Sequence, residues 1–286
     1  MDLSASLEPF RRSGDDLIDR WDGSRLLRTL PTAHGHIAYR ATLAGSIDAP
    51  TLDLTVDDAS ARQAVKQGVR ASFVAAPPDF SALLQRDAVL ATLDRLYPGL
   101  RPVLTLDLFG ALVRAISAQQ VNLRWAVTTR RRLAEAFGDA HTVAGETLYS
   151  LNPARLAAAG VTEIRALQFT TRKAEYIISA AEAVASGRLS LAELRALPDD
   201  EVIARLVAVR GIGLWTAEWL LSRVLGRPRV VAGDLAVRKA VGLAYLGEAL
   251  PLEADVRRAT AHWGDSAEVA QILLLHGLTE GTLQAP

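Results

Sequence analysis

No cysteine occurs in this chain of 286 residues. Its absence excludes disulfides, thiol catalysis, zinc ribbons and iron–sulfur clusters. The chain also lacks a run of 18 consecutive apolar residues and a signal-peptide pattern at its start, so we expect a soluble intracellular protein with no membrane partner. The five histidines form only one closely spaced pair, His34 and His36 in a predicted turn, which is a poor candidate for a metal site.

The chain also has no net charge, because its 32 basic and 32 acidic residues balance. The charges are unevenly spread: residues 1–100 carry 11 basic and 13 acidic groups, residues 101–230 carry 17 and 12, and residues 231–286 carry 4 and 7. The central segment is therefore the basic one. A local basic face is enough to contact phosphates, although it is equally typical of a solvated surface.

Half of the residues are apolar, and their spacing divides the chain into two parts. The first hundred residues combine strand patterns with one short helical pattern over Ala59–Gly68. The predicted strands are Ala38–Ala44, Thr51–Val56 and Val69–Ala75. A break at Ala76-Pro77-Pro78-Asp79 follows, and from Ser81 onward nearly every segment has helical spacing. The sequence thus predicts a small α/β unit followed by a helical body.

The most informative stretch is a tight turn, Gly211-Ile212-Gly213, between two predicted helices at about 199–210 and 215–225. Two glycines let the backbone turn sharply and leave N–H groups free at the start of the second helix. Those donors and the helix dipole favour an anion, so we predict that this turn, with Arg210 beside it, binds DNA phosphates. Such a clamp carries no sequence information, and the alternative is an ordinary helix connection.

Two tryptophans lie on the second helix, directly after this turn. Trp215 and Trp219 are four residues apart, so both rings project from the same face. Paired tryptophans are often part of a core, but beside a phosphate clamp they are also suited to holding an unstacked base. The face of an indole attracts cations, which favours a positively charged, alkylated purine over a neutral base.

Asp234 follows a short apolar run and precedes another predicted helix over Leu235–Tyr245. The simplest interpretation is a helix N-cap, a position that aspartate favours. That role is compatible with a second one, because backbone N–H groups stabilise an ionised carboxylate and fix its position. A fixed anion stabilises the positive charge that builds up on a sugar when an N-glycosidic bond is cleaved.

These residues resemble the helix-hairpin-helix DNA glycosylase superfamily, in particular its bacterial 3-methyladenine DNA glycosylase II group. The resemblance is carried by the run Gly211-Ile212-Gly213-x-Trp215-Thr-Ala and by Asp234, twenty-three positions after Gly211. Further landmarks occur in the same order: Tyr97-Pro98-Gly99-Leu100-Arg101, Asp107-x-Phe109, Arg114-Ala115-Ile116-x-x-Gln119 and Arg172-Lys173-Ala174-Glu175.

The resemblance implies an α+β fold. A mostly helical, bilobal body with the active cleft between its lobes is expected, preceded by a small N-terminal α/β domain similar to the TATA-binding protein. The expected domains are residues 1–78 for the N-terminal unit, residues 79–106 with 231–286 for one lobe, and residues 107–230 for the other. The second lobe contains the helix-hairpin-helix motif at 199–225.

The resemblance also implies roles for single residues of the pocket. Asp234 is expected to be the catalytic carboxylate, and Trp215, Trp219 and Leu278 are expected to line the base pocket. Leu278 stands where relatives often carry an aromatic residue, so the pocket should be roomier. Relatives that also cut the DNA strand carry a lysine nucleophile at the position of Trp215, and we therefore expect a monofunctional enzyme that uses water.

A monovalent cation is the one inorganic group that the resemblance implies, and no organic cofactor is implied. The cation is expected to be held by the main-chain carbonyls of Val207, Val209 and Ile212.

The DNA contacts are expected to come from Gln119, Gln120, Arg210, Gly211, Ile212 and Gly213. Two of these depart from the family pattern, because Arg210 replaces a proline and Gln120 replaces a leucine wedge. An amide can still fill the gap left by a flipped base. The run Arg130-Arg131-Arg132 is better interpreted as a solvated helical face than as a DNA contact.

We therefore predict a monomeric, cytoplasmic and nucleoid-associated DNA glycosylase of base excision repair. Its expected partner is damaged double-stranded DNA, from which it removes alkylated bases such as 3-methyladenine. Two alternatives stay open: a catalytically silent DNA-binding or damage-sensing protein, and a glycosylase for hypoxanthine, uracil or 1-methyladenine. Asp234 favours an enzyme, because a pure DNA binder has no use for an anion near the phosphates.

Overall fold

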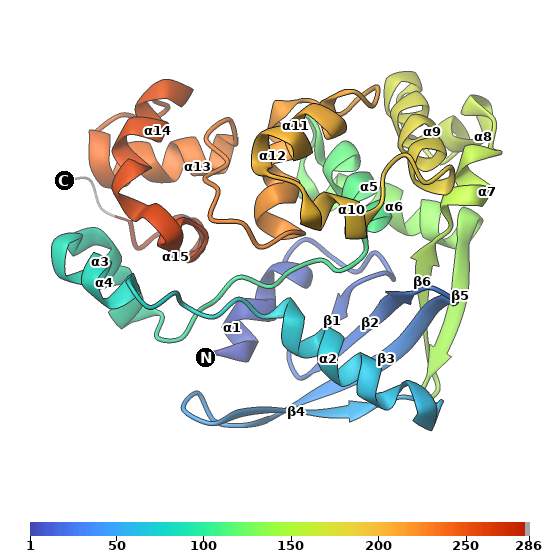
Figure 1. Ribbon diagram of the computed structural model, residues 1–286, viewed down its shortest axis with the longest axis horizontal. Coiled ribbons are helices and arrows are strands. Elements are labelled where there is room, and N and C mark those ends of the chain that lie inside the picture. Colours follow the sequence, from blue (N-terminus) through green and yellow to red (C-terminus); the bar gives the residue numbers. More distant parts are fainter. Residues whose placement is uncertain (284–286) are drawn as a thin grey trace.

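The computed structural model describes residues 1–283. These residues are mostly helical and contain two small antiparallel sheets, which confirms the predicted α+β class. Figure 1 shows the helices in two groups side by side, with the larger sheet below them. Every helix of the described residues is too short or too polar to cross a membrane.

The larger sheet comes from the N-terminal part of the chain and pairs its strands in chain order, all antiparallel. The strands are β1 (Arg20–Trp21), β2 (Arg25–Thr32), β3 (Gly35–Gly45) and β4 (Pro50–Thr55). The nearby helices are α1 (Leu3–Leu7) and α2 (Arg62–Ser72). Leu26, Ala41 and Leu54 lie side by side across three strands. They share an apolar cluster with Val65 and Val69 of α2, so this helix covers one face of the sheet.

The predicted strand over Val69–Ala75 is wrong. The structure has a helix there, α2, and beyond its end Phe73 makes a single β-bridge to Val103. Val65 and Val69 are four residues apart, so both enter the core from one face of a helix, although β-branched residues are more typical of strands. Strands β3 and β4 agree with the predicted ones apart from their ends, whereas β1 and β2 have no counterpart in the prediction.

The smaller sheet is a hairpin of β5 (Gly138–Val143) and β6 (Glu146–Leu151), where the sequence predicts helical structure. It packs on the other face of the larger sheet, in a cluster that contains Leu27, Val143 and Leu148. Its turn residues, Ala144 and Gly145, have φ angles of +50° and +78°. Two-residue hairpin turns favour such angles, but alanine at the first position hides the usual sequence signal.

The helical body contains thirteen α-helices within the described residues. They are α3 (Phe80–Arg86), α4 (Ala88–Leu96), α5 (Leu108–Ala118), α6 (Leu123–Phe137), α7 (Pro153–Ala157), α8 (Val161–Ala166), α9 (Thr171–Ala185), α10 (Leu191–Ala196), α11 (Asp199–Val207), α12 (Leu214–Arg223), α13 (Leu235–Val241), α14 (Glu253–Thr260) and α15 (Ala267–Glu280). Short 3-10 helices lie at Glu8–Phe10, Ala59–Ala61 and Ala261–Ser266, and a π-helical turn at Gly242–Leu246 extends α13.

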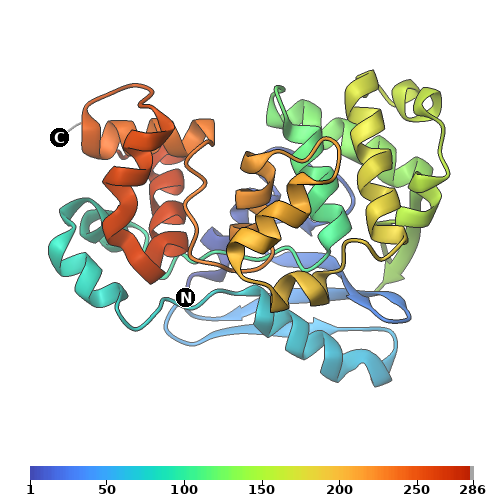
Figure 2. The ribbon, with the colours of Figure 1, turned by 45° about the horizontal axis from the view of Figure 1, so that its top comes forward.

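Two separate apolar cores hold these helices in two groups, which Figure 2 shows side by side. Helices α5 to α12 enclose one core, with Leu112, Ile177 and Leu220 among its buried side chains. Helices α3, α4 and α13 to α15 enclose the other, around Leu90 and Trp263. The chain crosses from one group to the other between α4 and α5 and again between α12 and α13. Trp215, Trp219 and Asp234, which the sequence analysis singles out, lie next to this second crossing.

Candidate active site

The hairpin between α11 and α12 depends on one glycine. Helix α11 ends at Val207, three residues before its predicted end, and α12 begins at Leu214, one residue before its predicted start. Gly211 has a φ of +92°, and a Cβ at this position would lie 2.2 Å from Cγ of Tyr176. Only glycine permits both the left-handed backbone and the close approach of this ring.

The N-terminus of α12 offers hydrogen-bond donors. Gly213 is its N-cap, and no side chain among the described residues caps the helix. Gly213 is exposed and Leu214 beside it is 47% exposed, so the first N–H groups are open to an anion. Arg210 precedes the turn with an exposed side chain, and its guanidinium donates to Glu175 at 2.6 Å. The turn therefore has donors for a phosphate and a positive charge alongside.

Asp234 is the N-cap of α13, as predicted. Its Oδ1 accepts hydrogen bonds from the backbone N–H groups of Ala236 at 2.9 Å and Val237 at 3.1 Å. Its Oδ2 accepts one from Nε1 of Trp215 at 3.0 Å. Three donors on two different helices therefore hold the carboxylate in one orientation.

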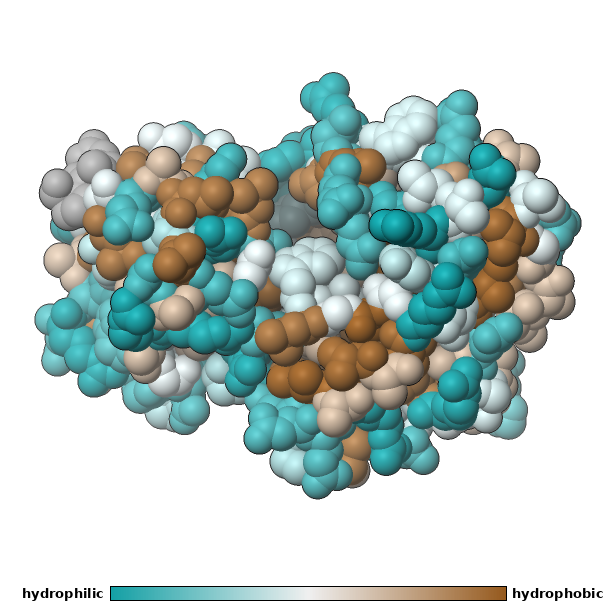
Figure 3. Space-filling model, turned by 90° about the horizontal axis from the view of Figure 1, so that it is seen from above, coloured by the Kyte–Doolittle hydropathy of each residue, from teal (hydrophilic) through white to brown (hydrophobic). Residues whose placement is uncertain are grey.

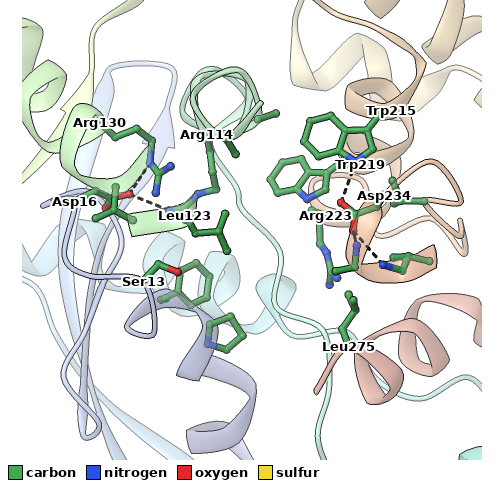
Figure 4. A pocket seen from close by; sticks show the side chains of 18 of the residues that line it. Ser13, Asp16, Arg114, Leu123, Arg130, Trp215, Trp219, Arg223, Asp234 and Leu275 are labelled. Carbon is green, nitrogen blue, oxygen red and sulfur yellow. Dashed lines mark hydrogen bonds and ion pairs between the residues drawn. The ribbon is translucent and has the colours of Figure 1, made fainter. Parts of the chain in front are cut away.

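A cavity of about 290 Å³ opens next to Asp234, at the boundary between the two helix groups (Figure 4). Trp215 and Trp219 line it from α12, Val237 from α13 and Leu275 from α15. Both indoles are half-buried, and Trp219 also packs against the core of α5 to α12. The volume is at the lower end of the range of small-molecule pockets and suits one planar ring system, such as a base.

The opposite wall of the cavity includes residues of an N-terminal segment that no sequence pattern marks. Ser13 and Asp16 of the N-terminal segment face the tryptophans across the cavity, together with Arg114 and Arg130 (Figure 4), and Phe10 also lines it. The N-terminal segment is far from the hairpin in the sequence and carries no motif. Only the folded chain brings these residues to the same site.

Arg130 is buried, with 4% exposure, so the predicted solvated face is wrong for this residue. Its Nε donates to Oδ2 of Asp16 at 2.9 Å, and Nη2 of Arg114 lies 3.5 Å from the same oxygen. Burial alone would raise the pKa of Asp16, but the charges of both arginines lower this pKa below its usual range. Arg131, by contrast, is exposed and pairs with Glu135 one turn later.

Two further ionisable groups, Arg223 and Glu268, influence each other near Asp234. Arg223 of α12 lines the cavity close to Asp234 (Figure 4). On α15, Glu268 is 3% exposed, and neither carboxylate oxygen has a hydrogen-bond partner within the described residues. Burial raises the pKa of Glu268 to about 7, although the charge of Arg223 opposes this shift. Burial also lowers the pKa of Arg223, against the charges of Glu268 and Asp234.

Leu278 does not line this cavity, which corrects the predicted base pocket. It lies about one turn beyond Leu275 on α15 and packs against the apolar core of α3, α4 and α13 to α15. Leu275, three residues earlier, lines the cavity instead. The cavity residues contributed by α15 are Gln271 and Leu275, so this helix supplies no aromatic ring to it.

The two glutamines predicted to contact DNA have different environments. The side-chain amide of Gln119 donates to the carbonyl of Gly211 at 3.4 Å, which ties the end of α5 to the hairpin. Gln120 is exposed and has a φ of +54°, an uncommon conformation for a residue other than glycine. Leu123, three residues later, lines the cavity, so this loop borders its mouth.

Exposed apolar side chains at helix starts are a feature that the sequence analysis did not identify. Leu123 begins α6, Leu214 begins α12 and Leu235 begins α13, with exposures of 60%, 47% and 55%. Seen from above, the molecule has a hollow bordered by apolar patches (Figure 3). Exposed apolar groups of this kind, next to helix N-termini, suit a ligand that offers both bases and phosphates.

The carbonyls predicted to hold a monovalent cation lie at the end of α11 and in the turn that follows. The carbonyl of Val209 accepts the N–H of Ile212 at 3.1 Å, and its second lone pair is still available. The set formed with the carbonyls of Val207 and Ile212 is neutral and oxygen-only, which fits a hard cation. Elsewhere in the described part of the chain, no group of three or more His, Asp or Glu side chains is arranged to hold a metal.

The chain is similar to known DNA glycosylases. It is 35% identical over 150 residues to the DNA-3-methyladenine glycosylase of Bacillus subtilis (strain 168), a match that covers 52% of this chain and 50% of that protein. The chain thus spans about half the length of the curated relatives it matches.

Two solved structures are similar in fold. A 3-methyladenine DNA-glycosylase from Archaeoglobus fulgidus has a TM-score of 0.84 at 22% identity, over 96% of this chain and 94% of that chain. The Schizosaccharomyces pombe 3-methyladenine DNA glycosylase Mag1, solved in complex with abasic DNA, has a TM-score of 0.55 at 25% identity, over 64% of this chain and 88% of that chain.

The family described as HhH-GPD superfamily base excision DNA repair protein matches residues 113–265. This match spans more than half of the chain and includes the hairpin, both cavity tryptophans and Asp234. The chain therefore belongs to the HhH-GPD superfamily of base excision DNA repair proteins.

Proposed function

We propose that this protein is a monofunctional DNA glycosylase that removes alkylated bases, such as 3-methyladenine, from double-stranded DNA. The observation that carries the proposal is the carboxylate of Asp234, which borders a base-sized cavity and is fixed by three hydrogen bonds beside two indole rings. The similarity to 3-methyladenine glycosylases supports the choice of substrate.

Catalysis starts with a base turned out of the duplex into the cavity. As the N-glycosidic bond breaks, its electron pair leaves with the base and positive charge develops on the deoxyribose. The carboxylate of Asp234 stabilises this charge without reorganising, because backbone amides and the Trp215 indole already hold it in place. A water molecule then adds to the sugar, so the products are a free base and an abasic site.

The two tryptophans supply the surfaces for the extruded base. Methylation gives a purine a positive charge, which the indole faces of Trp215 and Trp219 attract and the carboxylate of Asp234 complements. Arg114 on the opposite wall is paired with Asp19 at 2.7 Å, so its charge is offset. The indole faces and the carboxylate of Asp234 therefore favour a cationic base over a neutral one, whereas the nearby charge of Arg223 opposes it.

The hairpin holds the DNA backbone in this proposal. The N–H groups at the start of α12 and the exposed guanidinium of Arg210 bind phosphates. Gln120, exposed at the mouth of the cavity, fills the place of the flipped base. Gln119 acts instead as a brace for the hairpin, because its amide is engaged by the Gly211 carbonyl.

The lack of strand-cutting activity is part of the proposal and has a simple chemical basis. A lyase step needs an amine nucleophile next to the sugar. The chain has three lysines, Lys66, Lys173 and Lys239, and none of them lines the cavity. Trp215 holds the position at which strand-cutting relatives carry their lysine, so we infer that water is the nucleophile.

We also infer the larger organisation that the resemblance implies. The separate apolar cores support a division into residues 1–78, residues 79–106 with 231–286, and residues 107–230. A four-stranded antiparallel sheet with a helix on one face agrees with an N-terminal domain similar to the TATA-binding protein. A monovalent cation on the carbonyls of Val207, Val209 and Ile212 would stiffen the turn, and the protein is inferred to act as a cytoplasmic, nucleoid-associated monomer.

The test is base release from a set of duplexes that each contain one lesion: 3-methyladenine, 1-methyladenine, hypoxanthine or uracil. We expect free methylated purine by mass spectrometry and abasic sites that break only after alkali. Release of hypoxanthine or uracil alone would support glycosylase activity but contradict the proposed specificity for alkylated bases. Tight binding of lesions without release of any base would favour the alternative, a damage sensor without catalysis.

A further inference from the structure

A second concave surface lies on the N-terminal sheet. It is a groove of about 590 Å³ between β4 and α2, also lined by Met1 and Leu3. None of its lining residues lines the catalytic cavity. In Figures 1 and 2, β4 and α2 lie at the lower edge of the molecule, below the helical body. The groove is therefore a site separate from the one that holds the base.

One wall of the groove is an open strand edge. β4 is the last strand of its sheet and pairs only with β3 among the described residues. Alternate N–H and C=O groups of an edge strand point away from the sheet and lack strand partners. An edge that borders a groove, instead of being covered, can accept an extended peptide as an additional strand.

The floor of the groove is apolar. Leu52 and Leu54 of β4 meet Val69 of α2 and Phe73, which follows α2, and all four belong to the same apolar cluster. Val69 is buried, but the other three side chains are only half-buried. The groove therefore offers apolar area that a bound segment would remove from water.

The rim of the groove is basic. Arg62, Lys66 and Arg70 recur at every fourth position of α2, so they form one stripe along the helix, and all three are exposed and line the groove. No acidic group among the described residues lies within ion-pair distance of these three side chains. Asp53 is the single carboxylate in the lining. The lining of the groove therefore carries more positive than negative charge.

We propose that this groove binds an extended, acidic peptide segment of a partner protein. The segment pairs with the edge of β4, buries apolar side chains on the floor and places carboxylates against the stripe of Arg62, Lys66 and Arg70. Length fits as well, because β4 offers six residues for pairing. The proposal is independent of which lesion the catalytic cavity accepts.

DNA is the other polyanion to consider. The three cations alone would suit phosphates, but an apolar floor and an open strand edge offer nothing to a phosphate backbone. Both features suit a peptide, whose backbone forms ladder hydrogen bonds and whose side chains alternate between the two faces.

The test uses the full chain and two labelled eight-residue peptides, Glu-Glu-Val-Val repeated twice and Lys-Lys-Val-Val repeated twice. In either register, both faces of such a strand carry charged and apolar side chains. Fluorescence anisotropy should show saturable binding of the acidic peptide and none of the basic one. No binding of the acidic peptide, or equal binding of both, would overturn the proposal.

A triple variant locates the contact: Arg62→Glu, Lys66→Glu and Arg70→Glu. We expect it to weaken binding of the acidic peptide about tenfold or more, since several rim charges are reversed at once. A control triple makes the same change of charge at exposed positions elsewhere: Arg165→Glu, Arg188→Glu and Arg195→Glu. The control should bind like the unchanged protein, and an equal loss in both triples would overturn the proposed site.

Two further measurements keep the result clear. If the triple variant does not fold, Lys66→Glu alone should still weaken binding of the acidic peptide about threefold. Hydrogen exchange at the amides of β4 should slow when the acidic peptide is added. If the triple variant binds the acidic peptide with unchanged affinity but binds an undamaged duplex more weakly, the stripe is a DNA contact and the proposal is contradicted.

Discussion

The indole Nε1 of Trp215 donates a 3.0 Å hydrogen bond to Oδ2 of Asp234. One side chain therefore offers its face to the cavity and its edge to the carboxylate, and it links α12 to the start of α13. This bond is the only one to Asp234 from a side chain among the described residues. In the proposed mechanism, this bond links binding of the base by Trp215 to the position of the Asp234 carboxylate.

Trp215→Phe keeps an aromatic face but removes this donor together with part of the ring area. A hydrogen bond to a charged group contributes about 1.5–3 kcal/mol, so single-turnover base release should slow by about tenfold to a hundredfold. Trp219→Phe is the matched control, because Trp219 lines the same cavity without bonding Asp234. It should stay within about threefold. Equal slowing in both variants would show that loss of ring area, and not of the bond, is responsible.

Gly211→Ala should destabilise the hairpin and weaken DNA binding together. Alanine at this position would have to adopt a φ of +92°, which disfavours any residue with a Cβ, and its Cβ would lie 2.2 Å from the Tyr176 ring. We therefore expect a loss of about 2 kcal/mol or more in the free energy of unfolding. Gly213→Ala is the control, because its φ is −98° and nothing lies within 4 Å of the added atom. Urea unfolding and duplex titration should separate the two, and similar losses would refute the steric argument.

The wall opposite the tryptophans depends on the buried pair of Asp16 and Arg130, with exposed fractions of 3% and 4%. Asp16→Asn leaves the Arg130 charge without its anion, so unfolding should become easier by about 3 kcal/mol or more. Glu135→Gln, which breaks the exposed pair with Arg131, should cost less than about 1 kcal/mol.

The same pair predicts a pH dependence. The pKa of Asp16 is lower in the folded protein than its ordinary value of 3.8, so its contribution to stability is fully present above that value and is lost as the pH falls. Urea unfolding at several acidic pH values should show a flatter profile for Asp16→Asn than for the unchanged protein. Identical profiles would contradict the assignment of the low pKa to this pair.

Glu268 predicts the opposite dependence. Its pKa is about 7 in the folded protein and 4.5 as an ordinary value, so the folded state holds more protons between these values. The free energy of unfolding should therefore fall by up to about 3 kcal/mol as the pH rises from 4.5 to 7, and stay low above it. Glu268→Gln removes this charge and should be the more stable protein at pH 8. A variant less stable than the unchanged protein at that pH would contradict the account.

Features that depend on local chemistry were predictable from the sequence. The Gly211-Ile212-Gly213 turn, the capping role of Asp234 and the shared face of Trp215 and Trp219 all follow from neighbouring residues. The helical spacing after Ser81 holds for most of the body. These features need only backbone sterics and the helical repeat.

Features that depend on long-range contacts were not predictable. In the sequence, Arg130 does not differ from other charged residues in a basic run. Its burial depends on a contact with Asp16, which lies more than a hundred residues earlier in the chain. How far along α15 the cavity extends is decided by the packing of the whole helix, so Leu275 lines it and Leu278, about one turn further on, does not. The hairpin around Ala144 likewise lacks the turn residues that usually announce one.

The most direct test of the central claim is Asp234→Asn, measured for base release and for duplex binding on the same samples. The substitution removes the charge and keeps the side-chain size, so hydrolysis should fall by about a hundredfold or more. Affinity for lesion-containing DNA should be unchanged or higher, because an anion near the phosphates is gone. Release of methylated purines at the original rate by this variant would contradict the mechanism.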